Sequence, residues 1–91
     1  MGAGNIAQSR YNPLPIGANA TVNITGSRIG GFLCTVSGTL SVVRKNEDGT
    51  TTTLISALPV SAGTWVDMPF YLSSHGGTAT TADGAVGVLA V

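Results

Sequence analysis

Residues 30–43 alternate between two kinds of side chain, and this pattern constrains the fold more than any other stretch of the chain. No apolar series at i, i+3, i+4 and i+7 runs through the window, so a helix is not indicated. The residues are β-branched, aromatic and threonine-rich, as is typical of strands. In an extended backbone one side of the stretch is apolar, and it carries Phe32, Cys34, Val36, Leu40 and Val42.

Ser37 and Gly38 interrupt this alternation. Two such residues between strand-like runs predict either a tight hairpin turn or a bulge that bends one long strand, and we favour the hairpin. The inward side chains of this stretch and of the later strands form the predicted core: Phe32, Cys34, Val36, Leu40, Val42, Leu54, Val66, Phe70, Val88 and Leu89.

Short alternating segments separated by turn residues continue along the chain. Further strands are expected at residues 20–25, 50–58, 65–72, 78–82 and 85–91. The pairs Asp48-Gly49 and Asp83-Gly84 predict hairpin turns. Proline cannot donate a ladder hydrogen bond, so Pro59 is expected to end its strand or to place it at a sheet edge. Pro69 is expected at a sheet edge or at a bulge.

The last of these strands, residues 85–91, is almost entirely apolar, which predicts that both of its faces are covered. About seven short strands with closely spaced turns are typical of a small antiparallel β-sandwich or barrel. A chain of 91 residues has room for one such domain, and we assign it to residues 19–91.

Residues 1–18 lack either period and are interpreted as an extended N-terminal arm. Pro13 and Pro15 favour extended backbone in the residues around them. The alternative is an ordinary frayed terminus. If the segment is an arm, its candidate contact residues for a partner are Arg10, Tyr11, Pro13, Leu14 and Ile16.

Charge is scarce in this chain. Only 9% of the residues are charged and the formal net charge is zero, so little repulsion keeps copies apart and an existence within an assembly is favoured. A nucleic-acid partner is not expected, because such binding requires many Lys and Arg contacts to phosphates. No apolar run is long enough to cross a membrane, and the first residues do not resemble a secretory signal.

No catalytic or metal-binding pattern stands out. His75 is the only histidine and Cys34 the only cysteine, and no nucleophile motif accompanies them. The scattered carboxylates have neither zinc-ligand nor calcium-loop spacing. We therefore expect no enzyme activity, no cofactor and no metal, with Cys34 as a buried small hydrophobe and His75 in a solvated loop.

Three segments together, GGFLCTVSGTLSVV, LISALPVSAGTWVDMPFYL and DGAVGVLAV, resemble the small decoration or cement proteins of tailed-bacteriophage heads. The resemblance covers roughly residues 16–91 and depends on the types of residues in these segments and on the order of the segments. It implies a non-enzymatic virion protein on the outer capsid surface, made in the bacterial host cytoplasm. It also implies a homo-oligomer, with a trimer favoured, whose N-terminal arm binds the major capsid protein.

A second class stays open from the residues alone. A tail, fibre or head-tail junction domain with the same β character would bind a receptor or a carbohydrate through Trp65 or Tyr71. More often such aromatic residues belong to the core of a small β domain.

Overall fold

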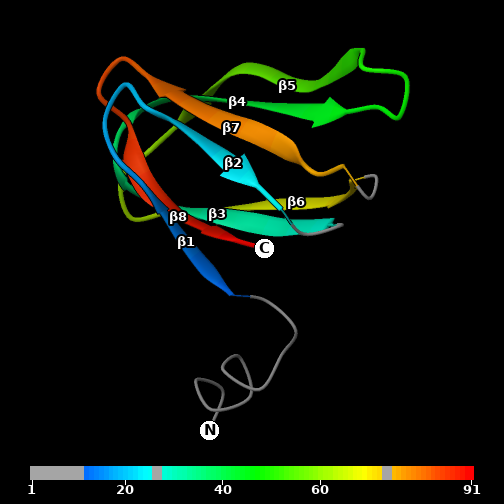
Figure 1. The fold of residues 1–91 in the computed structure, drawn as a ribbon. Coiled ribbons are helices and arrows are strands. Elements are labelled where there is room, and N and C mark those ends of the chain that lie inside the picture. The colour runs from blue at the N-terminus through cyan, green and yellow to red at the C-terminus, as the bar shows by residue number, and fades with distance from the viewer. Residues whose placement is uncertain (1–11, 26–27, 73–74) are drawn as a thin grey trace, which may run out of the picture.

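The computed structural model describes residues 12–25, 28–72 and 75–91, which form eight β-strands and no helix (Figure 1). The first four strands are β1 (Pro13–Ile16), β2 (Thr21–Ile24), β3 (Arg28–Val36) and β4 (Gly38–Lys45). The last four are β5 (Thr51–Val60), β6 (Trp65–Tyr71), β7 (Gly77–Ala82) and β8 (Val86–Ala90).

These strands form two antiparallel sheets of four strands each. Sheet A has the order β1-β8-β3-β6, and sheet B has the order β2-β7-β4-β5. The two sheets face one another as the layers of a sandwich (Figure 1). The predicted all-β class is confirmed, and of the two architectures left open the sandwich is the one observed.

The strand order is that of a long antiparallel hairpin, closed by the β4–β5 turn, whose two arms are rolled up into two sheets. Strands β4 and β5 pair next to its closed end, followed along the ribbon by β3 with β6, β2 with β7 and β1 with β8. Rolling adds two further pairs, β3 with β8 and β4 with β7, which complete the two sheets. This is the strand order of a jelly roll.

The favoured hairpin at Ser37 and Gly38 is wrong. Strand β3 belongs to sheet A and β4 to sheet B, so the chain passes from one sheet to the other at Ser37. Sandwich corners of this kind are made where a continuous strand bends, which is closer to the alternative of a bent long strand. Glycine is required there, because a Cβ on Gly38 would lie 2.5 Å from the Ala85 nitrogen and 2.6 Å from the Ala82 oxygen.

The second predicted hairpin, at Asp83 and Gly84, is also wrong, although the turn itself is present. The Ala85 N–H donates to the Ala82 carbonyl at 3.2 Å, and Asp83 and Gly84 have φ values of 55° and 86°. Strand β7 lies in sheet B and β8 in sheet A, so this turn joins the two sheets. The hairpin at Asp48 and Gly49 is confirmed, since it joins the paired strands β4 and β5.

Pro59 and Pro69 both lie on edge strands, which is one of the two alternatives predicted for each. Pro59 is in β5 at one edge of sheet B, and Pro69 is in β6 at one edge of sheet A. The extended backbone predicted around Pro13 and Pro15 is confirmed as well. That segment is β1, however, and it pairs with β8 over its whole length. This part of the predicted arm therefore belongs to the domain and adds one strand to the seven that were predicted.

The core lies between the sheets and contains most of the predicted residues. Phe32, Cys34, Leu40, Val42 and Leu89 are buried, and Leu54, Val66 and Phe70 are half-buried against them. The predicted core position of Val88 is wrong, because Val88 alternates with buried Leu89 and lies half-buried on the outer side of sheet A. The structure adds further buried apolar side chains that were not among the predictions, namely Ile16, Ile24, Ile29, Val60, Met68, Leu72, Ala79 and Ala85.

Val36 is a second predicted core residue on the outside, and it is 48% exposed. The register of β3 against β8 shifts between Cys34 and Val36, so Thr35 is an additional residue in the ladder. A single extra residue reverses the alternation, and Val36 lies opposite Val86 on the outside.

Candidate functional site

The five predicted contact residues fall into three groups. Arg10 and Tyr11 lie outside the described residues. Pro13 is exposed and Leu14 is half-buried on β1. Ile16 is only 2% exposed and packs in the core, so its predicted role as a contact for a partner is not supported by its position.

Strand β1 presents a blunted edge on its side away from β8. Asn12 and Val91 exchange both backbone hydrogen bonds, at 2.7 and 2.9 Å, which fixes the alternation along this pair of strands. In that alternation the backbone groups of Pro13 and Pro15 are directed away from β8. Because neither proline has an N–H, another strand cannot receive hydrogen bonds from these two positions.

The outer side of sheet A is apolar across all four strands. One cross-strand row consists of Pro15, Val88, Leu33 and Trp65, which are aligned by the pairing of β1, β8, β3 and β6. Leu33 is 43% exposed and Trp65 is 53% exposed. We call this surface the apolar face, and define it by Pro13, Pro15, Leu33, Val36, Trp65, Val86, Val88 and Ala90.

The neighbouring row crosses the same four strands. It runs through Pro13, Ala90 and Gly31 to Asp67, which is the only charged residue in either row. The Trp65 ring lies across Gly31: a Cβ at position 31 would be 2.2 Å from Cζ2 of the ring. Glycine at this position therefore leaves the space that the Trp65 ring occupies.

The outer side of sheet B has the opposite character. Its first row passes from Thr21 through Thr80 to Ser41, and the hydroxyls of Thr21 and Thr80 are hydrogen-bonded at 2.9 Å. A second row contains Asn23, Thr78, Val43 and Thr53, of which only Val43 is apolar. We call this the threonine face. Its mainly polar side chains contrast with the apolar side chains on the outer side of sheet A.

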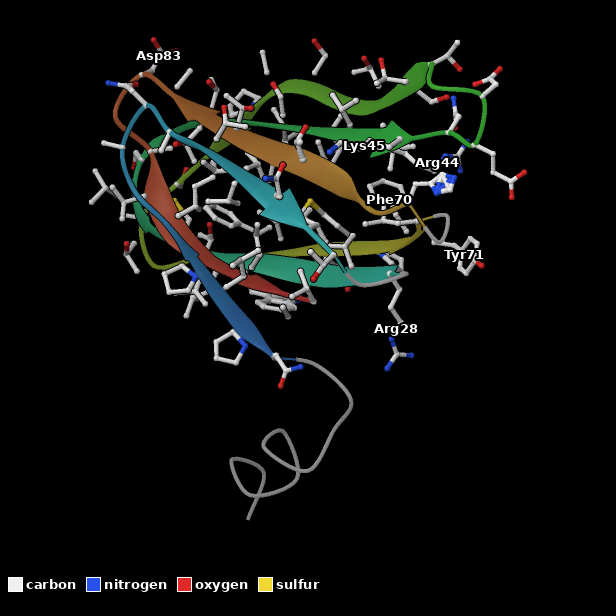
Figure 2. The ribbon with its side chains drawn as sticks, viewed as in Figure 1. Arg28, Arg44, Lys45, Phe70, Tyr71 and Asp83 are labelled. Atoms are coloured by element: carbon white, nitrogen blue, oxygen red, sulfur yellow. The ribbon has the colours of Figure 1, made fainter. Side chains whose placement is uncertain are left out.

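A shallow hollow of about 420 Å³ lies where the end of β6 approaches the β4–β5 turn. Its lining residues are Arg44, Asn46, Glu47, Asp48 and Tyr71, and Tyr71 is 71% exposed. Figure 2 shows Arg44 and Tyr71 at the same end of the sandwich, opposite the end that carries Asp83.

On one side of this hollow, hydrogen bonds to two threonines order the β4–β5 turn. The Thr50 hydroxyl and backbone N–H donate to Asp48 Oδ1 at 2.6 and 3.0 Å, and these bonds lower the pKa of the Asp48 carboxyl below its ordinary 3.8. Asn46 Nδ2 donates to the hydroxyls of Thr50 and Thr52 at 3.1 and 3.0 Å. The turn therefore presents ordered polar groups to the hollow.

The predicted burial of Cys34 is confirmed, and its thiol donates to the Val36 carbonyl at 3.1 Å. His75 is exposed in the turn before β7. No group of three or more His, Cys, Asp or Glu residues that could hold a metal ion is present in residues 12–25, 28–72 and 75–91. Within these residues there is also no helix that could span a membrane.

Sequence reasoning did not identify the apolar face as a site, although the chain carried a signal for it. The nearly all-apolar segment that ends the sequence predicted cover on both faces. In the structure the inner residues Gly87 and Leu89 of β8 are buried, while the outer residues Val86, Val88 and Ala90 remain half-exposed at the surface. The domain itself thus covers one of the two faces, and the other lies at its surface.

Comparison of the chain with protein-family models, with curated proteins and with solved structures finds no match.

Proposed function

We propose that this chain is a non-enzymatic structural protein of a virion, a decoration or cement protein that binds and stabilises the assembled phage head shell. The observation that carries the proposal is the apolar face on a domain with few charges. Such a surface is suited to a molecule whose exterior is covered by other proteins for most of its lifetime.

The fold class agrees with this role by analogy. Jelly rolls recur in viral capsid domains and in lectins, although a fold alone does not specify a function. The virion assignment itself comes from the sequence resemblance of residues 30–43, 54–72 and 83–91 to head decoration proteins.

The contact with the shell is assigned to the N-terminal residues that precede β1. Residues 1–12 precede β1, which lies at the edge of sheet A beside the apolar face. Arg10 and Tyr11 supply one charged and one aromatic contact, and several copies on a lattice would add their weak contacts through effective concentration.

Co-sedimentation with purified empty shells tests this assignment. Deleting residues 2–11 leaves β1 intact, so the domain should stay folded by circular dichroism while its retention on shells falls at least about tenfold. Arg10→Gln should reduce retention less, and mainly at low salt, because an exposed charge is screened as salt rises. The matched control is Thr80→Lys on the threonine face, which should bind shells as the unmodified protein does.

Two results would count against the assignment. If the deleted protein is retained as well as the full chain, the N-terminal residues do not hold the shell. If the full chain fails to sediment with shells at all, the decoration role itself is contradicted.

The hollow beside Tyr71 favours a second candidate, a receptor-reading or carbohydrate-reading domain of a tail or fibre. An exposed tyrosine ring is suited to stacking on a sugar, and the amide, guanidinium and carboxylates of the same hollow are suited to its hydroxyls. Tyr71→Ala should then abolish retention on immobilised bacterial-surface glycans, whereas Trp65→Ala should not. Equal glycan retention of both variants and the unmodified chain would contradict a site at this hollow.

A further inference from the structure

We propose that the free protein pairs with a second copy of itself, with the apolar face of one copy packed on the apolar face of the other about a two-fold axis. The pairing is separate from the contact with the shell, and it is tested on the free protein without shells. If the free protein does not pair, the decoration role is not contradicted. If the protein does not bind shells, the pairing is not contradicted.

The first argument is the amount of apolar surface in register. Leu33 and Val88 are neighbours on the two central strands of sheet A, with Trp65 and Pro15 on the two strands beside them. The row is therefore continuous from one edge of the sheet to the other. Covering it removes apolar area from water, which favours association.

The second argument concerns charge. The two rows of the apolar face contain one charged side chain, Asp67, near the β6 edge. A two-fold operation places the central Leu33 and Val88 of one copy against the same residues of the other, whereas edge residues meet a different part of the partner. An identical copy therefore presents an apolar centre of the same shape, with Asp67 on the edge strand and no cluster of like charges at the centre.

The third argument is size. Four strands at about 4.8 Å, with strand lengths of about 13–30 Å, give the face a projected area on the order of 400 Å². A standard interface buries about 800 Å² of accessible surface on each partner, about a sixth of the 5,099 Å² of this chain. Since accessible area exceeds projected area, the face matches one partner of the same width, and a weak to moderate dimer is expected.

The fourth argument excludes the edges of sheet A as the pairing surface. Pro13 and Pro15 remove the outward N–H groups of β1. Pro69 interrupts β6 at the opposite edge, beside the register shift between Ile29 and Gly31. A copy that approaches sheet A therefore gains little by extending the sheet, and gains most by covering its face.

Sedimentation equilibrium and tryptophan fluorescence of the free protein test the inference. The unmodified chain should give a mass twice 9.1 kDa. Trp65 is the only tryptophan, so its emission should move to the red when dilution separates the copies. Leu33→Lys, on an outward position of a central strand, should raise the dimer dissociation constant at least about tenfold. Thr80→Lys, at the matching position of sheet B, should leave it unchanged.

The fluorescence readout needs no variant, so the inference stays testable if Leu33→Lys does not fold. A single species of 9.1 kDa at about 100 μM, with Trp65 emission independent of concentration, would overturn the pairing. So would a dimer that folded Leu33→Lys retains at full strength. A trimer, which is the oligomer that the sequence resemblance favours, would overturn the two-fold geometry.

Discussion

Thr81 is the one polar side chain that is fully buried among the described residues, and it fixes the connection between β1 and β2. Its hydroxyl donates to the Gly17 carbonyl at 2.6 Å and accepts from the Ala20 N–H at 3.1 Å. Its own backbone N–H donates to the Ala20 carbonyl at 2.9 Å. A single side chain on β7 thus satisfies the polar backbone of the corner that carries the chain between the sheets.

Replacing Thr81 by valine keeps the volume and removes both hydroxyl hydrogen bonds. Because the Gly17 carbonyl and the Ala20 N–H lose this buried partner, we expect a loss of about 1–3 kcal/mol in the free energy of unfolding. Chemical denaturation measures it. Thr80→Val is the control, because the Thr80 hydroxyl bonds to exposed Thr21 at the surface and should cost much less.

The Asp48 carboxylate should titrate below the ordinary range. Hydrogen bonds from Thr50 favour the ionised form in the folded hairpin, so the pKa of Asp48 is lower than the 3.8 of an unperturbed aspartate. The stabilisation is therefore complete above pH 3.8 and is lost as the pH falls through the folded-state pKa. A carboxyl NMR titration should show this shift, and Thr50→Val should return the pKa towards 3.8; an unchanged titration in that variant would contradict the cause.

At the level of elements, the edge strands show how the sandwich limits its own aggregation. The two edge strands of sheet A contain three prolines, Pro13 and Pro15 on β1 and Pro69 on β6. Each removes an N–H that could otherwise donate to a further strand or interrupts the regular strand at that edge. On β1 the two prolines occupy alternate positions, which are the two that face away from β8. An apolar face next to an unblocked edge would favour uncontrolled sheet extension, and the prolines prevent it.

Substituting both Pro13 and Pro15 by alanine should restore two outward N–H donors to the edge of β1. We expect the variant to fold, because these positions make no ladder hydrogen bonds to β8, and to aggregate faster at equal concentration. Light scattering and thioflavin fluorescence over time measure the rate. Alanine at Pro59 on the edge of sheet B is the control. Equal rates for the double variant and the unmodified chain would show that the prolines do not protect this edge.

At the level of the whole molecule, the rolled ribbon makes most strand pairs non-local. Only β4 and β5 pair across a short turn, while β1 pairs with β8 from the other end of the described chain. Such topologies fold slowly, because loop entropy is lost before the distant contacts form. The hairpin of β4 and β5 is the natural place for folding to begin.

Two alanine variants test that order in stopped-flow experiments. Val42→Ala, on the buried side of β4, should mainly slow refolding. Leu14→Ala, on the half-buried side of β1, should mainly speed unfolding, because β1 joins the sheet late. Refolding of the unmodified chain should take milliseconds to seconds. The opposite assignment of the two effects would place the nucleus at the β1–β8 end.

Much of the fold was accessible from the sequence, but the candidate site was not. The β class, the inward residues Phe32 and Leu40, and the edge position of Pro59 follow from alternation and from the chemistry of proline. The apolar face was not identified, because residue types indicate that β8 needs cover on both faces without saying which face its own domain leaves open.

Local preferences by themselves determined that this chain is made of strands, and where it turns, because they act within a few residues. They fixed the turn backbone at Asp83 and Gly84 correctly. Only the tertiary structure decided that this turn and the Ser37 corner join different sheets, that β1 belongs to the domain, and that Val36 faces outward. Each of these depends on which distant strand lies alongside, and pairing across the whole chain is set by the joint burial of both sheets rather than by any local pattern.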